Sequence, residues 1–133
     1  MLSIFPSLLD YQFFAPLILR LALAAVFLVH GYPKLFGGFS HAVHFFNSSG
    51  IKPAKFWVVV VGLAELLGGI LLLAGFLVQP AAFILVANLL VAIWKVKFKA
   101  GFANGWEFDL VLIAMLLSLL ILGPGAYSID LPL

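Results

Sequence analysis

The sequence predicts an all-α integral membrane protein, a four-helix bundle in which residues 1–133 form a single transmembrane domain. Of the 133 residues, 65% are hydrophobic and 9% are charged. Soluble domains carry roughly 45–50% and about 25% of these classes. Runs of about 20 mainly apolar residues, the length needed to cross about 30 Å of hydrocarbon, recur along the chain. So few charged side chains could not cover a water-soluble surface, and we therefore expect the lipid bilayer to be the main partner.

The first expected helix covers about residues 13–32. It is apolar apart from Arg20 and His30, and Pro16 stands in its first turn, where proline is tolerated. Residues 1–19 contain no lysine or arginine, so they lack the basic start of a secretory signal peptide. We therefore expect the first apolar segment to be a retained membrane helix.

The next apolar stretch, residues 56–94, is long enough for two spans. Gln79-Pro80 divides it, because proline cannot continue the helix that precedes it but can begin the following one. We therefore expect one helix at about residues 56–76 and another at about residues 80–96, joined as a tight antiparallel hairpin.

The fourth expected helix covers about residues 106–123 and ends at the helix-stopping triplet of residues 123–125, Gly-Pro-Gly. Its uninterrupted apolar part is short. Glu107 and Asp109 are therefore expected at the membrane boundary or just inside it.

The lysines predict the orientation of the chain in the membrane. All of them lie in or beside the first and third interhelical connections, whereas the second connection and both ends of the chain have none. The positive-inside rule places such connections in the cytoplasm, so both termini are expected outside. The lysines are Lys34, Lys52, Lys55, Lys95, Lys97 and Lys99.

Composition disfavours several classes of function. The net charge of +2 is too small to neutralise a row of phosphates, so nucleic acid is not an expected partner. The chain contains no cysteine, which removes disulfides, thiolate ligands and thiol redox chemistry. His30, His41 and His44 form no recognisable metal motif, so no metal is expected. No residue is assigned a catalytic role.

Arg20 and Glu65 are the charged residues placed deep inside expected spans. Such a charge costs at least about 2.5–3.5 kcal/mol on insertion scales and needs a partner or a wet cavity. Measured from His30 and Lys55, which mark the expected helix ends, both lie about 15 Å from the same boundary. We therefore expect a buried ion pair between the first two helices, which either fixes their packing or belongs to a ligand or proton site.

A second polar group is expected at the cytoplasmic ends of the first and fourth helices. Helix capping and interfacial anchoring explain each of its residues taken singly. Together they offer the donors and acceptors that would bind a polar headgroup or a quinone ring. Asn88 either extends this lining or links helices by a hydrogen bond. The group consists of His30, Tyr32, Lys34, Trp106, Glu107 and Asp109.

Four motifs in order along the chain resemble the DoxX family of small bacterial inner-membrane proteins. They are HGYPKL at residues 30–35, ELLGG at 65–69, GWE at 105–107 and GPGAYSID at 123–130. The resemblance implies a multi-pass protein of the bacterial inner (plasma) membrane. It also implies a link to redox chemistry, because relatives include a small subunit of a thiosulfate:quinone oxidoreductase and proteins proposed to hold oxidative-stress enzymes at the membrane.

Three functions are compatible with these features. The first is an accessory subunit or anchor of a quinone-linked or oxidative-stress system, with a polar intramembrane pocket, quinone as its only suggested cofactor, and a redox protein or a second copy of the chain as partner. The alternative is a carrier for a small molecule, lipid or ion, which would need polar residues in both halves of the membrane. The third is a stand-alone membrane oxidoreductase, so enzymatic activity is left open.

Overall fold

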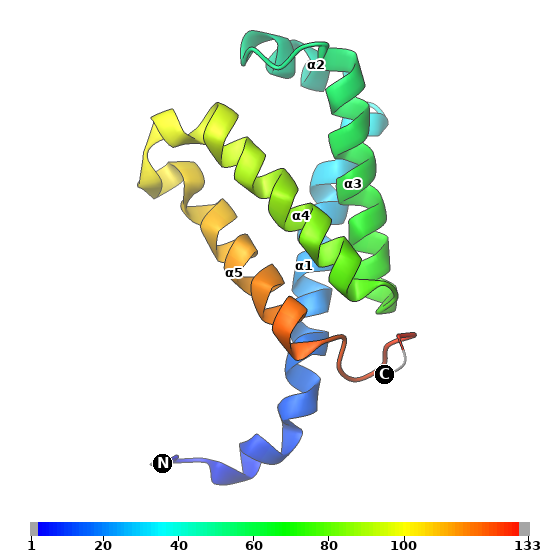
Figure 1. Ribbon diagram of the computed structural model, residues 1–133, viewed down its shortest axis with the longest axis vertical. Helices are drawn as coiled ribbons and strands as arrows, with labels where there is room; N and C mark the ends of the chain where they lie inside the picture. The colour runs from blue at the N-terminus through cyan, green and yellow to red at the C-terminus, as the bar shows by residue number, and fades with distance from the viewer. Residues whose placement is uncertain (1–2, 131–133) are drawn as a thin grey trace.

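The computed structural model describes residues 3–130, and all regular structure in this range is helical (Figure 1). A 3₁₀ segment, Pro6–Phe14, precedes the first α-helix. The connection between the last two α-helices consists of short π and 3₁₀ turns at Ile93–Lys97, Phe98–Ala100 and Phe102–Trp106. The α-helices are α1 (Ala15–Leu35), α2 (Phe39–Ser48), α3 (Ala54–Ala74), α4 (Val78–Ala92) and α5 (Glu107–Leu122).

Four helical stretches are long and apolar enough to cross a membrane, which confirms the predicted all-α membrane bundle. At most 33% of the most apolar window of any stretch is buried inside the protein. The rest is an apolar outer surface, as expected where lipid rather than water covers the helices. The stretches are Pro6–Leu35, Ala54–Ala74, Val78–Ala100 and Phe102–Leu122.

Helix α2 was not expected from the sequence, which predicted only a loop between the first two spans. It lies across one end of the bundle, beside the start of α3 (Figure 1). Ala42 and Phe46 are its buried residues, and they pack against Ala54 and Val58 of α3. The helix therefore covers the first turns of α3 that extend beyond α1.

Helices α1 and α3 are antiparallel and touch closely at glycines. A Cβ atom added at Gly31 would lie 2.7 Å from the backbone nitrogen of Leu66 and 2.9 Å from Cβ of Glu65. A Cβ atom at Gly69 would lie 3.0 Å from Cγ of Leu28. Small residues permit such close approach of membrane helices. This contact fixes the register of the two helices and sets Gly31 level with Glu65.

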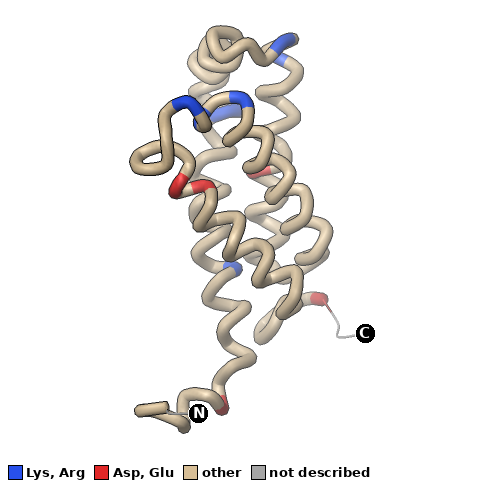
Figure 2. The backbone as a smooth tube through the Cα atoms, turned by 60° about the vertical axis from the view of Figure 1, so that its left-hand side comes forward, with Lys and Arg blue, Asp and Glu red and all other residues tan. Residues whose placement is uncertain are grey.

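Charged groups divide the bundle into two ends. One end, here called the lysine end, contains α2 and the α4–α5 connection, and most basic positions gather there (Figure 2). The other, here called the terminal end, contains the N-terminal 3₁₀ segment, the α3–α4 turn and the residues that follow α5 (Figure 1). Between the two ends, α1, α4 and α5 share a core of fully buried side chains that includes Leu23, Leu85 and Leu116.

Candidate functional site

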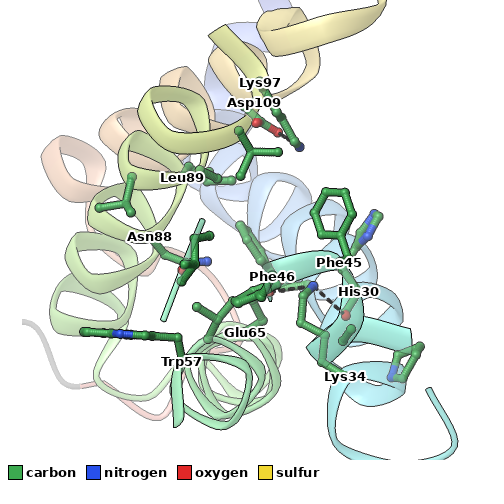
Figure 3. A pocket seen from close by; sticks show the side chains of 18 of the residues that line it. His30, Lys34, Phe45, Phe46, Trp57, Glu65, Asn88, Leu89, Lys97 and Asp109 are labelled. Carbon is green, nitrogen blue, oxygen red and sulfur yellow. Dashed lines mark hydrogen bonds and ion pairs between the residues drawn. The ribbon is translucent and has the colours of Figure 1, made fainter. Parts of the chain in front are cut away.

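A cavity of about 460 Å³ lies at the lysine end and is lined by all five α-helices (Figure 3). Its walls are mainly apolar, and five aromatic rings line it, those of Phe27, Phe45, Phe46, Trp57 and Phe108. A small polar set shares this lining: His30, Lys34, His41, Glu65, Asn88, Lys97 and Asp109.

The first ion pair of the cavity joins α1 to α3. Lys34 Nζ lies 2.8 Å from Glu65 Oε1 and also donates a hydrogen bond to the backbone oxygen of His30 at 3.0 Å (Figure 3). The side chain of Glu65 is only 8% exposed. The close glycine contacts described above bring the two helices near enough for this pair to form, because both partners lie within one helical turn of a glycine.

The second ion pair joins the α4–α5 connection to the first turn of α5. Lys97 Nζ donates to Asp109 Oδ1 at 2.9 Å, and the Asp109 side chain is 2% exposed (Figure 3). Asp109 Oδ2 is buried and has no hydrogen-bond partner among residues 3–130. With almost no accessible surface, this oxygen is enclosed by neighbouring protein atoms and does not face the open space of the cavity.

The predicted ion pair between Arg20 and Glu65 is wrong. Glu65 pairs with Lys34, and Arg20 lies about 16 Å farther along α1 from the level of Glu65. The expectation took His30 and Lys55 as the ends of two helices that start level. In the structure α1 continues to Leu35 and the first turns of α3 extend beyond it, which shifts the register.

Arg20 lies instead at the terminal end. Its side chain is fully buried, and Nη2 donates to the backbone oxygens of Ala126 at 2.7 Å and Tyr127 at 3.2 Å. A Cβ atom at Gly75, where φ is +73°, would collide with the guanidinium group. Arg20 thus holds the C-terminal residues against the bundle and does not line the cavity.

The C-terminal residues make further hydrogen bonds at this end. The backbone nitrogen of Asp130 donates to the oxygen of Gly75 at 2.8 Å, and its carboxylate accepts from the backbone nitrogens of Leu77 at 2.8 Å and Val78 at 3.0 Å. The backbone N–H groups at the start of a helix have no hydrogen-bond partner within that helix, and a nearby carboxylate stabilises them. The GPGAYSID motif at residues 123–130 therefore has a structural role: its last residue caps the start of α4.

The structure brings together part of the predicted polar group. His30, Lys34, Asn88 and Asp109 line the cavity, and the rings of His30 and Phe108 are 6.4 Å apart. The ends of α1 and α5 therefore meet as expected, although only some of the predicted residues face the shared space.

The other predicted residues do not line the cavity. Tyr32 is 57% exposed and packs on Phe36 with ring centroids 5.0 Å apart. Trp106 packs edge-on against Phe102 at 4.7 Å. Glu107 accepts a hydrogen bond from the backbone nitrogen of Asn104 at 3.2 Å. These contacts agree with helix capping for Glu107 and with interfacial anchoring for Tyr32 and Trp106, the roles expected of each residue taken alone.

Sequence reasoning missed Lys97, His41 and Trp57 as lining residues. Lys97 was taken only as an orientation signal, since its reach to Asp109 depends on the π turns of the connection. His41 and Trp57 come from α2 and the start of α3. Apolar residues recurring at 39, 42, 43 and 46 were a signal for the helix that carries His41.

No metal centre is formed by the part of the chain that the structure describes. Residues 3–130 contain no group of three or more His, Cys, Asp or Glu side chains placed to hold an ion. The cavity instead offers two lysines, two carboxylates, an amide and two imidazoles among aromatic walls. Such a mixture can hydrogen-bond the polar head of an amphiphilic molecule while its apolar part contacts the rings.

The spans and the cavity define a small multi-pass α-helical membrane protein with a polar pocket toward one end. The DoxX family profile matches residues 15–98, and the chain belongs to the DoxX family. No solved structure matches it significantly.

Three curated relatives illustrate the family. "Putative oxidoreductase CatD" of Bacillus subtilis (strain 168) is 32% identical over 114 residues, covering 86% of this chain and 83% of the relative. "Inner membrane protein YphA" of Escherichia coli (strain K12) is 30% identical, covering 86% of each chain. "Uncharacterized membrane protein Rv3486" of Mycobacterium tuberculosis (strain ATCC 25618 / H37Rv) is 30% identical, covering 84% of this chain and 77% of the relative.

Proposed function

We propose that this protein binds a small ring-headed amphiphile of the quinone class in the cavity at the lysine end, and serves as a membrane subunit or anchor of a redox system. One observation carries the proposal: two ion pairs, Lys34–Glu65 and Lys97–Asp109, line one cavity between otherwise apolar helices. Ionisable groups inside membrane helices are expensive and mark ligand or proton sites by default.

The dimensions and walls of the cavity support a ring-headed ligand. Its volume of about 460 Å³ lies within the roughly 300–1,000 Å³ typical of small-molecule pockets. Phe45, Phe46 and Phe108 offer apolar surface for a planar ring. A hydrocarbon tail would meet the exposed apolar faces of the helices, where lipid already lies.

The redox part of the proposal rests on two further points. The curated relative from Bacillus subtilis is named a putative oxidoreductase. This chain has no cysteine, so electrons would pass through the bound molecule or a partner protein. We place the partner, either a soluble redox protein or a second copy of the chain, beside the lysine end, and we place that end in the cytoplasm.

The position of the polar groups argues against a carrier. A carrier needs polar contacts along a path through both halves of the membrane. The cavity-lining charges lie toward one end, and Arg20 at the other end is engaged by the backbone oxygens of Ala126 and Tyr127. A pocket accessible from one side explains this asymmetry better than a transport path.

Steric blocking of the cavity tests the proposal. Ala92 lines the cavity, whereas Ala114 is exposed on the outer face of α5. Duroquinone is titrated by calorimetry into the protein in lipid nanodiscs, with empty nanodiscs as the blank. We expect saturable binding that Ala92→Phe weakens at least about ten-fold and that Ala114→Phe, the matched control, leaves within about two-fold.

Two results would contradict the proposal. Absence of saturable duroquinone binding to the unaltered protein would remove the quinone-class ligand. Binding that Ala92→Phe does not change would move the ligand to another part of the protein.

A further inference from the structure

Helices α3 and α4 are in contact near the turn that joins them and separate toward the lysine end (Figure 1). At the contact, a Cβ atom added at Gly68 would lie 2.9 Å from Cδ1 of Leu85. Because antiparallel helices pair residues in opposite order, Val61 and Ala92 lie at the same level beyond this contact. Both residues line the cavity. The cavity therefore occupies the seam along which α3 and α4 would otherwise pack.

The apolar core is divided at the same place. Toward the lysine end α3 packs Val58 against Phe46 of α2, in one cluster of buried residues. Leu89 of α4 and Leu112 of α5 belong to a second cluster. Phe46, Leu89 and Leu112 all line the cavity. The cavity therefore lies between α2 and α3 on one side and α4 and α5 on the other.

The rim of the cavity between α3 and α4 is apolar and exposed. Trp57 of α3 is 41% exposed and Val91 of α4 is 52% exposed, and both also line the cavity. Figure 3 shows Trp57 on the side of the cavity opposite His30. Between α1 and α5, by contrast, the rings of His30 and Phe108 are only 6.4 Å apart. The opening on the outer surface of the bundle is therefore the gap between α3 and α4.

We infer that the cavity opens sideways into the bilayer between α3 and α4, and that its ligand is a membrane-resident molecule whose alkyl or prenyl chain passes through this opening into lipid. This inference rests on the proposed function and adds the route and the chain to its ligand class. Val61 lies about 10 Å inside the apolar stretch Ala54–Ala74, so the opening is at the level of the hydrocarbon.

The chemistry of the opening favours an alkyl chain over other occupants. An alkyl chain that already lies in lipid loses little on passing between apolar side chains, which resemble lipid. A peptide segment would bring backbone N–H and C=O groups that neither lipid nor this rim could hydrogen-bond. The ionised groups that would bind the polar head, Lys34 with Glu65 and Lys97 with Asp109, lie within the cavity.

Two quinones that differ only in the alkyl chain test the route. Trimethylbenzoquinone and decylplastoquinone have the same ring, with one methyl group replaced by a decyl chain. Each is titrated by calorimetry into the protein in nanodiscs, and its affinity is referred to its concentration in lipid, measured with empty nanodiscs. If the decyl chain stays in lipid, the two affinities should agree within about ten-fold. A chain that had to leave lipid for water would weaken binding more than about a thousand-fold.

Matched substitutions locate the opening. Val61→Trp narrows it, whereas Val60→Trp makes the same change one residue away, on the outer surface of α3, where Val60 is 38% exposed. Val61→Trp should weaken decylplastoquinone at least about ten-fold more than trimethylbenzoquinone, because the decyl chain needs the occupied space. Val60→Trp should leave the ratio of the two affinities within about two-fold. Val91→Trp repeats the narrowing from α4, so the result does not depend on one variant.

The outcomes separate this inference from the proposed function. If decylplastoquinone binds the unaltered protein more than ten-fold more weakly than trimethylbenzoquinone, the inference is overturned, and binding of the latter still supports the function. Equal weakening of both compounds by Val61→Trp and by Val91→Trp also overturns it. If neither compound nor duroquinone binds, both proposals fail. The comparison in the unaltered protein decides the question even if neither variant folds.

Discussion

The two ends of the bundle bury charge in different ways. At the terminal end Arg20 is enclosed by backbone, and its Nη2 contacts two carbonyl oxygens of the chain that follows α5. At the lysine end each carboxylate meets a lysine that is partly exposed, 22% for Lys34 and 41% for Lys97, across a cavity. The ion pairs of the lysine end border a cavity of about 460 Å³, whereas Arg20 is fully buried and its Nε and Nη1 have no hydrogen-bond partner among residues 3–130. The buried charge of Arg20 therefore holds the chain that follows α5, whereas the buried charges of the lysine end line the candidate site.

The packing around left-handed glycines also differs between the two ends. At the terminal end the chain adopts left-handed conformations at Gly75 and Gly125, with φ of +73° and +72°. A Cβ atom at Gly125 would lie 2.6 Å from Cβ of Pro16. Tight turns of glycine let the tail lie flat on the bundle. The lysine end also has left-handed glycines, at Gly37, Gly50 and Gly101, but a Cβ atom added at any of these would meet nothing within 4 Å.

The largest expected effect is loss of the Lys34–Glu65 pair. Lys34→Met strands a carboxylate that is almost fully buried, and we expect a loss of about 2–4 kcal/mol of stability, below the full cost of a broken buried pair because Lys34 is partly exposed. Glu65→Leu leaves the more exposed lysine and should cost less. The double change should cost less than the sum of the two single changes, as measured by thermal unfolding in detergent.

A second double-mutant cycle, in which Arg20 replaces Lys34, is the control for the Lys34–Glu65 measurement. Because Arg20 and Glu65 have different partners, the losses from Arg20→Met and Glu65→Leu should add within about 0.5 kcal/mol. Strong coupling between Arg20 and Glu65, together with additive losses for Lys34 and Glu65, would restore the pairing expected from the sequence and remove the distinction between the two ends.

The next effect is release of the tail. Arg20→Met removes the donor that holds the oxygens of Ala126 and Tyr127, and we expect a cost of about 2 kcal/mol. A spin label at Tyr127→Cys, in a chain without natural cysteine, should become more mobile in the Arg20→Met background. Duroquinone binding at the other end should stay within about two-fold. If Arg20→Met leaves the mobility of the spin label unchanged but abolishes duroquinone binding, Arg20 acts on the cavity and not on the tail.

The fold could be predicted from composition because each span is a long apolar run that requires no knowledge of its neighbours. Helix α2 was the exception. Its polar residues His41 and His44 suggested a loop, and its helical state depends on packing Phe46 against Val58 of another helix. The spacing of its apolar residues was visible in the sequence, but the surface that receives them was not.

The candidate site could be predicted only in part, because it depends on helix register. Motifs identified the residues near the ends of α1 and α5, and His30, Lys34 and Asp109 do line one cavity. The partner of Glu65 could not be found by measuring from the expected helix ends, because α1 continues to Leu35 and the first turns of α3 extend beyond it. The assumed level of Arg20 was therefore wrong by about three turns. Close glycine contacts decide the register, and their pairing is a property of two helices together.

A smaller effect is expected at the cap of α4. Asp130→Ala removes the acceptor of the backbone nitrogens of Leu77 and Val78 and should lower stability by about 1 kcal/mol. Asp10→Ala is the matched control, since Asp10 lies exposed in the N-terminal 3₁₀ segment. Thermal unfolding in the same detergent measures both. Equal losses for the two variants would mean that the tail does not stabilise the terminal end through its carboxylate.

The smallest effect distinguishes the aromatic residues of the lysine end. Trp57 lines the cavity, whereas Trp106 packs against Phe98 and Phe102 outside it. Trp57→Phe should weaken duroquinone binding about two- to five-fold, because part of an aromatic contact is lost. Trp106→Phe should change binding by less than about two-fold, since the remaining ring still fills the aromatic cluster. Calorimetry in nanodiscs measures both variants under one set of conditions. Equal weakening by the two substitutions would extend the ligand site to the start of α5 as the sequence suggested, and the lysine end would then bind its ligand over a wider surface than the cavity.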